Sequence, residues 1–179
     1  MATNIDIYMA ETEIENTAKN LIFDRTQADI DYALECERTG IYTDENLRGA
    51  YNISDRNRVG GAVNFIIGCL ENTGTYDFGG KDKLIKDDWN VYDIITHEDN
   101  SRILSSLENL KRVLPYNKTA EVPESLDSLT YQKANIIENI IFDLYGVFLR
   151  LMNSWLYSGD GYLSDFDPFD WQGWDDYGA

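Results

Sequence analysis

The chain has 179 residues, 43% of them hydrophobic, a length and composition that suit one folded domain. Its 32 acidic and 15 basic residues give a net charge of −17, and a field of that sign repels the phosphates of nucleic acids. No stretch approaches the ~20 apolar residues of a membrane helix, and the N-terminus lacks a basic region followed by an apolar one. We therefore expect a protein made in a cytoplasm, without membrane insertion and without nucleic acid as a partner.

The first 24 residues carry two conflicting patterns. Ile14, Ala18, Leu21 and Ile22 follow helical spacing, whereas residues 4–9, NIDIYM, alternate like a short strand. These patterns leave the structure of the N-terminal segment, residues 1–24, open between a helix and a short strand.

Four helices are predicted after similar starts. A capping residue comes first, and in three cases an aspartate follows three residues later, where it satisfies free amides and complements the helix dipole. The caps are Thr26, Asn52, Thr96 and Thr130; the third residues after them are Asp29, Asp55, Asp99 and, in the exception, Lys133. Aligning the starts also aligns Asp31, Asn57, Ser101 and Asn135. We expect helices over about 26–38, 52–70, 96–114 and 130–157 that dock in a similar way, and we expect Gly40 to end the first of them.

The last helix is predicted to be central. Apolar residues recur on it at steps of three and four, as in a heptad seam, and further apolar residues widen that surface. The seam is Ala134, Ile137, Ile141, Leu144, Phe148, Leu151 and Trp155, widened by Ile136, Ile140 and Val147. The fold class is therefore mainly α, a compact bundle of about four helices over residues 25–158 with irregular connections. Trp89 should anchor one connection, and Gly60 and Gly61 should lie where a neighbouring helix approaches closely.

The residues with catalytic or ligand chemistry are few. His97, the single histidine, falls at a predicted helix start, and no nucleophile, metalloprotease or nucleotide-binding motif occurs. Cys36 and Cys69 lie in helical patterns without metal-ligand spacing and are interpreted as reduced, buried thiols. We expect no enzyme, no cofactor, no metal and no catalytic residue.

The segment 159–179 is acidic and aromatic. It contains six aspartates and no basic residue, and its aromatic side chains have no helical stripe in which to be buried. The candidate partner-binding residues are Phe166, Phe169, Trp171, Trp174 and Tyr177. They could insert into a partner's grooves, fold back over the chain's own helices, or stack on sugars.

Four motifs occur in one order along the chain. They are RTQADIDYA at Arg25–Ala33, GAYN followed by DRNRV within Gly49–Val59, a tryptophan before a D-I step within Trp89–Ile94, and LTYQKANIIE at Leu129–Glu138. In these motifs the chain resembles a family of phage and prophage tail-associated structural proteins from Gram-positive bacteria. The shorter segment between the first two helices and the acidic aromatic tail depart from that family.

The resemblance implies a function in the virion. It implies a non-enzymatic structural or adaptor protein, tail- or baseplate-associated, whose partners are other virion proteins, with self-association as a homo-oligomer left open. The matched residues are expected to be caps and core. Two alternatives stay open: an acidic phage-encoded inhibitor that mimics DNA, and a tail module that contacts carbohydrate.

Overall fold

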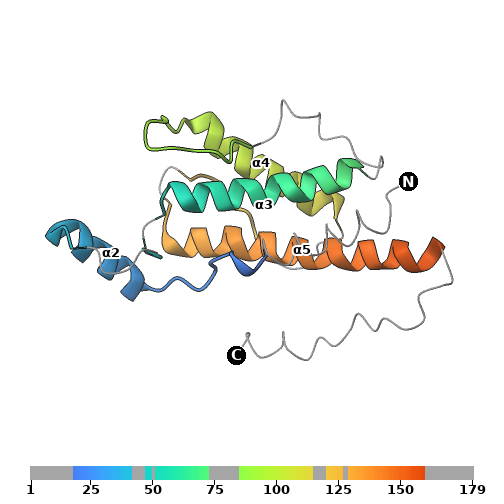
Figure 1. Cartoon of the computed structure of the whole chain (residues 1–179), viewed down its shortest axis with the longest axis horizontal. Helices are drawn as coiled ribbons and strands as arrows, with labels where there is room; N and C mark the ends of the chain where they lie inside the picture. The colour runs from blue at the N-terminus through green and yellow to red at the C-terminus, as the bar shows by residue number, and fades with distance from the viewer. Residues whose placement is uncertain are drawn as a thin grey trace. The chain divides into compact units, whose positions relative to one another are not determined.

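The computed structural model describes residues 18–41, 47–49, 51–72, 85–114, 120–126 and 129–159, with the main chain only at 72 and 153–159. Within these ranges it contains four α-helices and no strand: α2 (Gln27–Thr39), α3 (Ile53–Asn72), α4 (His97–Val113) and α5 (Tyr131–Gly159) (Figure 1). The chain divides into two units, Met1–Phe148 and Leu149–Ala179. The prediction of a mainly α, bundle-like fold is confirmed for the described residues.

The similar helix starts are present in the structure. The side chains of Thr26 and Thr96 accept hydrogen bonds from the main-chain N–H groups of Asp29 and Asp99, and those carboxylates accept from the threonine N–H groups at 2.7 and 2.9 Å. Asn52 makes the same exchange with Asp55. The hydroxyl groups of Thr26 and Thr96 also donate to these carboxylates, and the hydroxyl bonds together with the main-chain bonds lower the pKa values of Asp29 and Asp99. At α5 the Thr130 hydroxyl accepts from the N–H of Lys133 at 3.3 Å, with no acid to return the bond.

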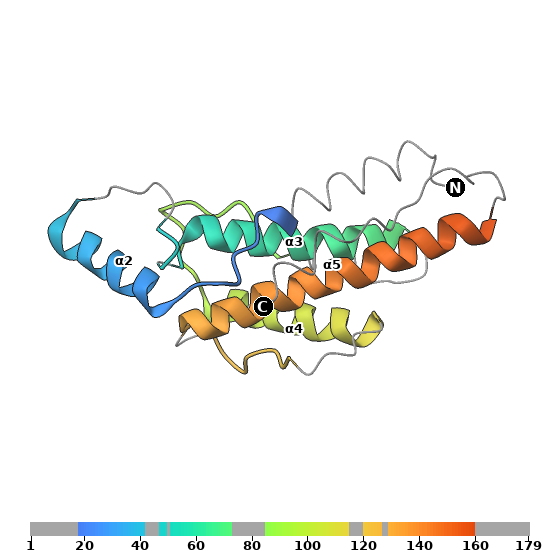
Figure 2. The ribbon, with the colours of Figure 1, turned by 90° about the horizontal axis from the view of Figure 1, so that it is seen from below.

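The core lies among α3, α4 and α5. Helices α3 and α5 lie next to each other in both ribbon views, and α4 passes behind α3 in Figure 1 (Figures 1 and 2). The Tyr145 hydroxyl on α5 donates to the Ala62 carbonyl oxygen on α3 at 3.0 Å, and its ring stacks on that of Phe65 with centroids 6.2 Å apart. The buried side chains of α5 include Ala134, Ile137, Ile140, Ile141, Leu144, Tyr145, Val147 and Phe148. Burial on so many sides confirms the central position predicted for this helix, although Ile136 is exposed.

Helix α2 contributes little to this core. Cys36 is its one buried residue, and Leu34 is 57% exposed. A Cβ added at Gly49 would collide with the main chain of Asp29, so residues 47–49 lie directly against the first turn of α2. The expectation that all four helices dock alike is therefore wrong for α2, because Cys36 is the one residue that this helix buries.

The close approach predicted at the two glycines occurs at Gly60 alone. A Cβ there would lie 2.9 Å from the Lys86 main-chain oxygen, whereas one at Gly61 would meet only the Asp87 carboxylate at 3.8 Å. The neighbour is the extended segment 85–89, not a helix as expected. An extended segment can place its own main chain against the glycine, whereas a helix would present a layer of side chains.

Three single-residue expectations have mixed outcomes. Cys36 is buried and Cys69 half-buried, and neither forms a disulfide. His97 is exposed in the first turn of α4, as predicted.

Among the described helices, none combines the length and the apolar character needed to cross a bilayer.

Candidate functional site

Four charged residues from three parts of the chain meet in the interior. We call Arg25, Asp55, Arg58 and Glu138 the ionic clasp. Arg25 lies in the extended segment before α2, Asp55 and Arg58 are three residues apart near the start of α3, and Glu138 is on α5. The Arg25 guanidinium reaches Asp55 at 2.9 Å and Glu138 at 2.7 Å, and Arg58 reaches Glu138 at 2.9 Å and also pairs with Asp55.

Every carboxylate oxygen of the clasp accepts hydrogen bonds from the protein. Glu138 Oε1 accepts from both arginines, and Oε2 accepts from Arg58 Nε at 3.1 Å and from the N–H of Ile22 at 2.6 Å. Asp55 Oδ1 accepts from both arginines, and Oδ2 accepts from the N–H of Asn52 at 2.9 Å. Neither carboxylate is therefore free to act as a general base, and both hold chain segments together.

The electrostatics of the clasp are balanced, with two arginines facing two carboxylates. Burial alone would lower the pKa of Arg58, but its hydrogen bonds and charge interactions with Glu138 and Asp55 raise it above the ordinary value. Nearby, burial and the charges of Glu138 and Asp55 raise the pKa of Tyr51, so its hydroxyl stays protonated. The Arg25 guanidinium lies 5.8 Å from the centre of the Tyr51 ring.

An asparagine on α5 fixes the main chain beside the clasp. Asn135 Oδ1 accepts from the N–H of Arg25 at 3.1 Å, and its Nδ2 donates to the Arg25 carbonyl oxygen at 2.9 Å. Glu138, one turn further along α5, holds the N–H of Ile22. The segment that leads into α2 therefore runs antiparallel to α5 and is bonded to it at two places.

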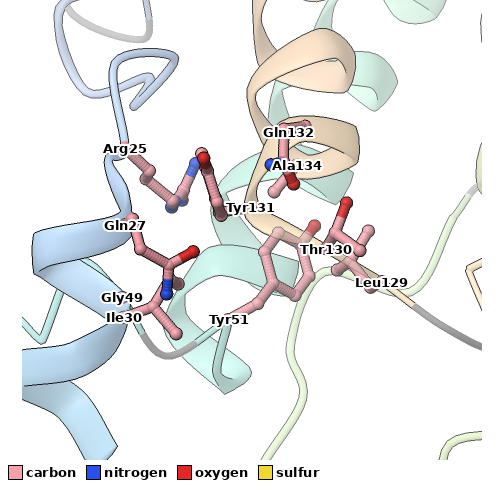
Figure 3. A pocket seen from close by; sticks show the side chains of 10 residues that line it. All are labelled: Arg25, Gln27, Ile30, Gly49, Tyr51, Leu129, Thr130, Tyr131, Gln132 and Ala134. Atoms are coloured by element: carbon pink, nitrogen blue, oxygen red, sulfur yellow. The ribbon is translucent and has the colours of Figure 1, made fainter.

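A cavity of about 360 Å³ opens next to the clasp. Figure 3 shows Gln27 and Ile30 on one side of it, Leu129 and Thr130 on the other, and the ring of Tyr51 between them. Arg25 also lines it, but the guanidinium already donates to Arg48, Ile22 and the two clasp carboxylates. The cavity therefore offers hydroxyl and amide groups and no unpaired charge from Arg25.

Helix α3 holds a second extended segment in the same manner. The side-chain amide of Asn57 accepts from the N–H of Trp89 at 2.7 Å and donates to its carbonyl oxygen at 3.0 Å. Two turns later, Asn64 makes the same pair of bonds with Ile85, at 2.9 and 2.6 Å. Gly60 lies between the two asparagines, where the missing side chain lets the segment approach.

Two cations lie near the ring of buried Trp89. The guanidinium of Arg56 lies 5.4 Å from its ring centre, and the ammonium of Lys86 lies 5.2 Å away. The indole N–H donates to the Lys86 carbonyl oxygen at 2.7 Å. This confirms Trp89 as the anchor of its connection, and it fixes the chain that follows.

The sequence predicts five partner-binding residues, all in the segment 159–179. Phe166, Phe169, Trp171, Trp174 and Tyr177 lie outside the described residues, as does the rest of 160–179. Within the described ranges, no group of three or more histidine, cysteine, aspartate or glutamate side chains is placed to hold a metal ion.

The comparisons with known proteins add no relative. The chain matches no protein-family model, and no curated protein or solved structure is significantly similar to it.

Proposed function

We propose that this chain is a non-enzymatic structural or adaptor protein of a phage virion, tail- or baseplate-associated, that works through contacts with other virion proteins. The observation that carries the proposal is the saturation of the ionic clasp. The four residues of the clasp, Arg25, Asp55, Arg58 and Glu138, all lie in the motifs behind the resemblance. Their side chains form hydrogen bonds with one another and with the main chain. Such residues support a fixed architecture more than a reaction.

Mass spectrometry of purified particles tests the proposal. Particles from cells producing the encoding phage should contain the protein in a fixed ratio to the major tail proteins, and washing at moderate salt should not remove it. A non-structural phage protein from the same lysate is the control. Abundance in the lysate together with depletion from particles would contradict the proposal and favour the DNA-mimicking inhibitor.

A second experiment separates an architectural clasp from a reactive one. Buried ion pairs can often be replaced by apolar residues of similar volume without loss of fold. A variant with Arg25→Met, Arg58→Met, Asp55→Leu and Glu138→Leu that still folds should still enter particles. A variant that folds like the wild type and is excluded from particles would show that the charges themselves act in assembly.

A further inference from the structure

The connection after Trp89 exposes an unusual amount of apolar surface. In the segment 90–95, which we call the docking turn, Val91 is 77% exposed, Tyr92 91% and Ile94 85%. These are the largest exposures among the big apolar residues of the described chain, and they are consecutive apart from Asp93. Single exposed apolar residues are ordinary on protein surfaces, whereas a contiguous exposed group is a candidate interaction site.

The docking turn is held in one conformation. Asp93 Oδ2 accepts from the N–H of Asn90 at 2.9 Å and from its side-chain amide at 2.8 Å, and Asn90 Oδ1 accepts from the N–H of Tyr92 at 3.0 Å. Lys86 pairs with the Asp93 carboxylate at 3.2 Å. At the base of the turn, Trp89 is buried and its main chain is paired with Asn57. A partner would therefore meet side chains whose backbone is already ordered, which lowers the entropic cost of binding.

Charge around the turn selects the kind of partner. Residues 86–99 contain five acids and one lysine, a net charge of −4 with His97 neutral. The Asp88 and Glu98 side chains are 85% and 74% exposed; Asp88 pairs with Lys86, and Glu98 pairs with Arg102, which lies outside this segment. The segment 160–179, with six aspartates and no base, and a second copy of this chain at −17 would both be repelled. A surface with lysine or arginine around an apolar pocket would be attracted.

We propose that the docking turn binds a different protein, inserting Val91, Tyr92 and Ile94 into an apolar pocket rimmed by basic side chains. The proposal deepens the proposed function and rests on it in one respect: the partner is then another virion protein. Tyrosine at the centre of a contact is among the side chains that contribute most to binding energy, and the surrounding acids steer the encounter.

Site-specific photocrosslinking tests the proposal. The photoreactive residue p-benzoylphenylalanine replaces Tyr92 in the full chain, expressed in cells that produce the phage, and the control carries it at Leu34, which is exposed on α2. The expected product is one adduct with another polypeptide, attached at an apolar position next to lysines or arginines. No such adduct should form from position 34.

Binding of that purified polypeptide provides the second measurement. The double variant Tyr92→Ser and Ile94→Ser should weaken its affinity by roughly thirtyfold or more, and Leu34→Ser should leave it unchanged. Raising NaCl from about 0.05 to about 0.5 M should weaken wild-type binding several-fold through screening. Because all three side chains are exposed, melting curves of the variants should match the wild type.

Several outcomes would overturn the proposal that the docking turn binds a different protein. They are an adduct only within the chain or with a second copy, equal adducts from positions 34 and 92, no adduct from position 92, or wild-type affinity in the double variant. If the protein is present in particles while position 92 gives no adduct, the docking turn is refuted and the virion role stands. If position 92 captures a basic host protein and particles lack the chain, the docking turn stands and the virion role fails.

Discussion

Glu138→Gln is the sharpest test of the ionic clasp. The substitution keeps the shape of the side chain but replaces one carboxylate oxygen by an NH₂ group and removes the charge. In either amide orientation that NH₂ group faces two donors: the two arginines on the Oε1 side, or Ile22 N–H and Arg58 Nε on the Oε2 side. Two hydrogen bonds are lost, and Asp55 alone faces both arginines.

The expected cost follows from the burial of the group. Glu138 is fully buried, and removing one partner of a buried ion pair costs about 3–5 kcal/mol, because the remaining charge is left uncompensated. Total stabilities of domains are about 5–15 kcal/mol, so the variant should fold but be much weaker. With a urea dependence of about 2 kcal/mol per molar, the unfolding midpoint should fall by roughly 2 M.

Urea unfolding followed by circular dichroism measures this shift, with Glu98→Gln as the matched control. Glu98 pairs with Arg102 at 2.7 Å on the surface of α4, with side chains 74% and 49% exposed. Such pairs contribute about 0–1 kcal/mol, so the control should unfold close to the wild type. If both variants shift by the same small amount, the clasp does not hold the fold together and the reasoning is refuted.

Three further predictions concern the glycines, a helix cap and the tail. Gly61→Ala should stabilise α3 by up to about 1 kcal/mol in thermal melts, whereas Gly60→Ala should destabilise by about 1–3 kcal/mol because its Cβ would press on the Lys86 carbonyl oxygen; equal responses would show that segment 85–89 does not pack on Gly60. Because the pKa of Asp99 is lowered in the folded protein, its contribution is present above the ordinary carboxyl pKa and is lost as pH falls through the lowered value. Asp99→Asn should therefore cost about 0.3–1 kcal/mol at neutral pH and little at about pH 2 in urea titrations, and a difference that does not change with pH would contradict the role of Asp99 in the cap. A chain ending at Asp160 should melt like the full chain but fail to enter particles, with Trp171→Ala plus Trp174→Ala reproducing that failure; a large loss of stability with intact assembly would contradict the docking role of the tail.

Local patterns allowed much of the fold to be predicted from the sequence. The caps, the glycine stop after α2 and the apolar stripes depend on residues within a few positions of one another, so they can be predicted from the local sequence. Gly40, for example, ends α2 with a φ of 70° and its N–H on the Cys36 carbonyl oxygen. The segment that packs on Gly60 could not be predicted from the sequence, because a glycine indicates that another part of the chain can approach closely but not which part does so.

The ionic clasp was missed because its members are far apart in the sequence. Arg25 is 30 residues from Asp55 and 113 from Glu138, and no periodicity links them. One signal was present: Glu138 lies directly after Ile137 and three residues before Ile141, inside the widest apolar surface of the chain. A carboxylate at such a position requires a buried partner. The sequence could therefore have indicated an ion pair on α5, but not which arginines supply it.

The four similar helix starts differ in function at the fifth residue after each cap. In α3 and α5 this residue is Asn57 or Asn135, and each holds both the N–H and the carbonyl oxygen of one residue in an extended segment. An amide side chain can do so because it carries a donor and an acceptor on two separate atoms. The aspartate at the same place in α2 carries acceptors only, and the serine in α4 carries a single oxygen on a short side chain. The segment held by α5 leads into α2, and the segment held by α3 leads into α4, both antiparallel to the helix that holds them. The same kind of start therefore occurs in two kinds of helix. Helices α3 and α5 carry an asparagine that binds an extended segment, and helices α2 and α4 follow the segments that these asparagines bind.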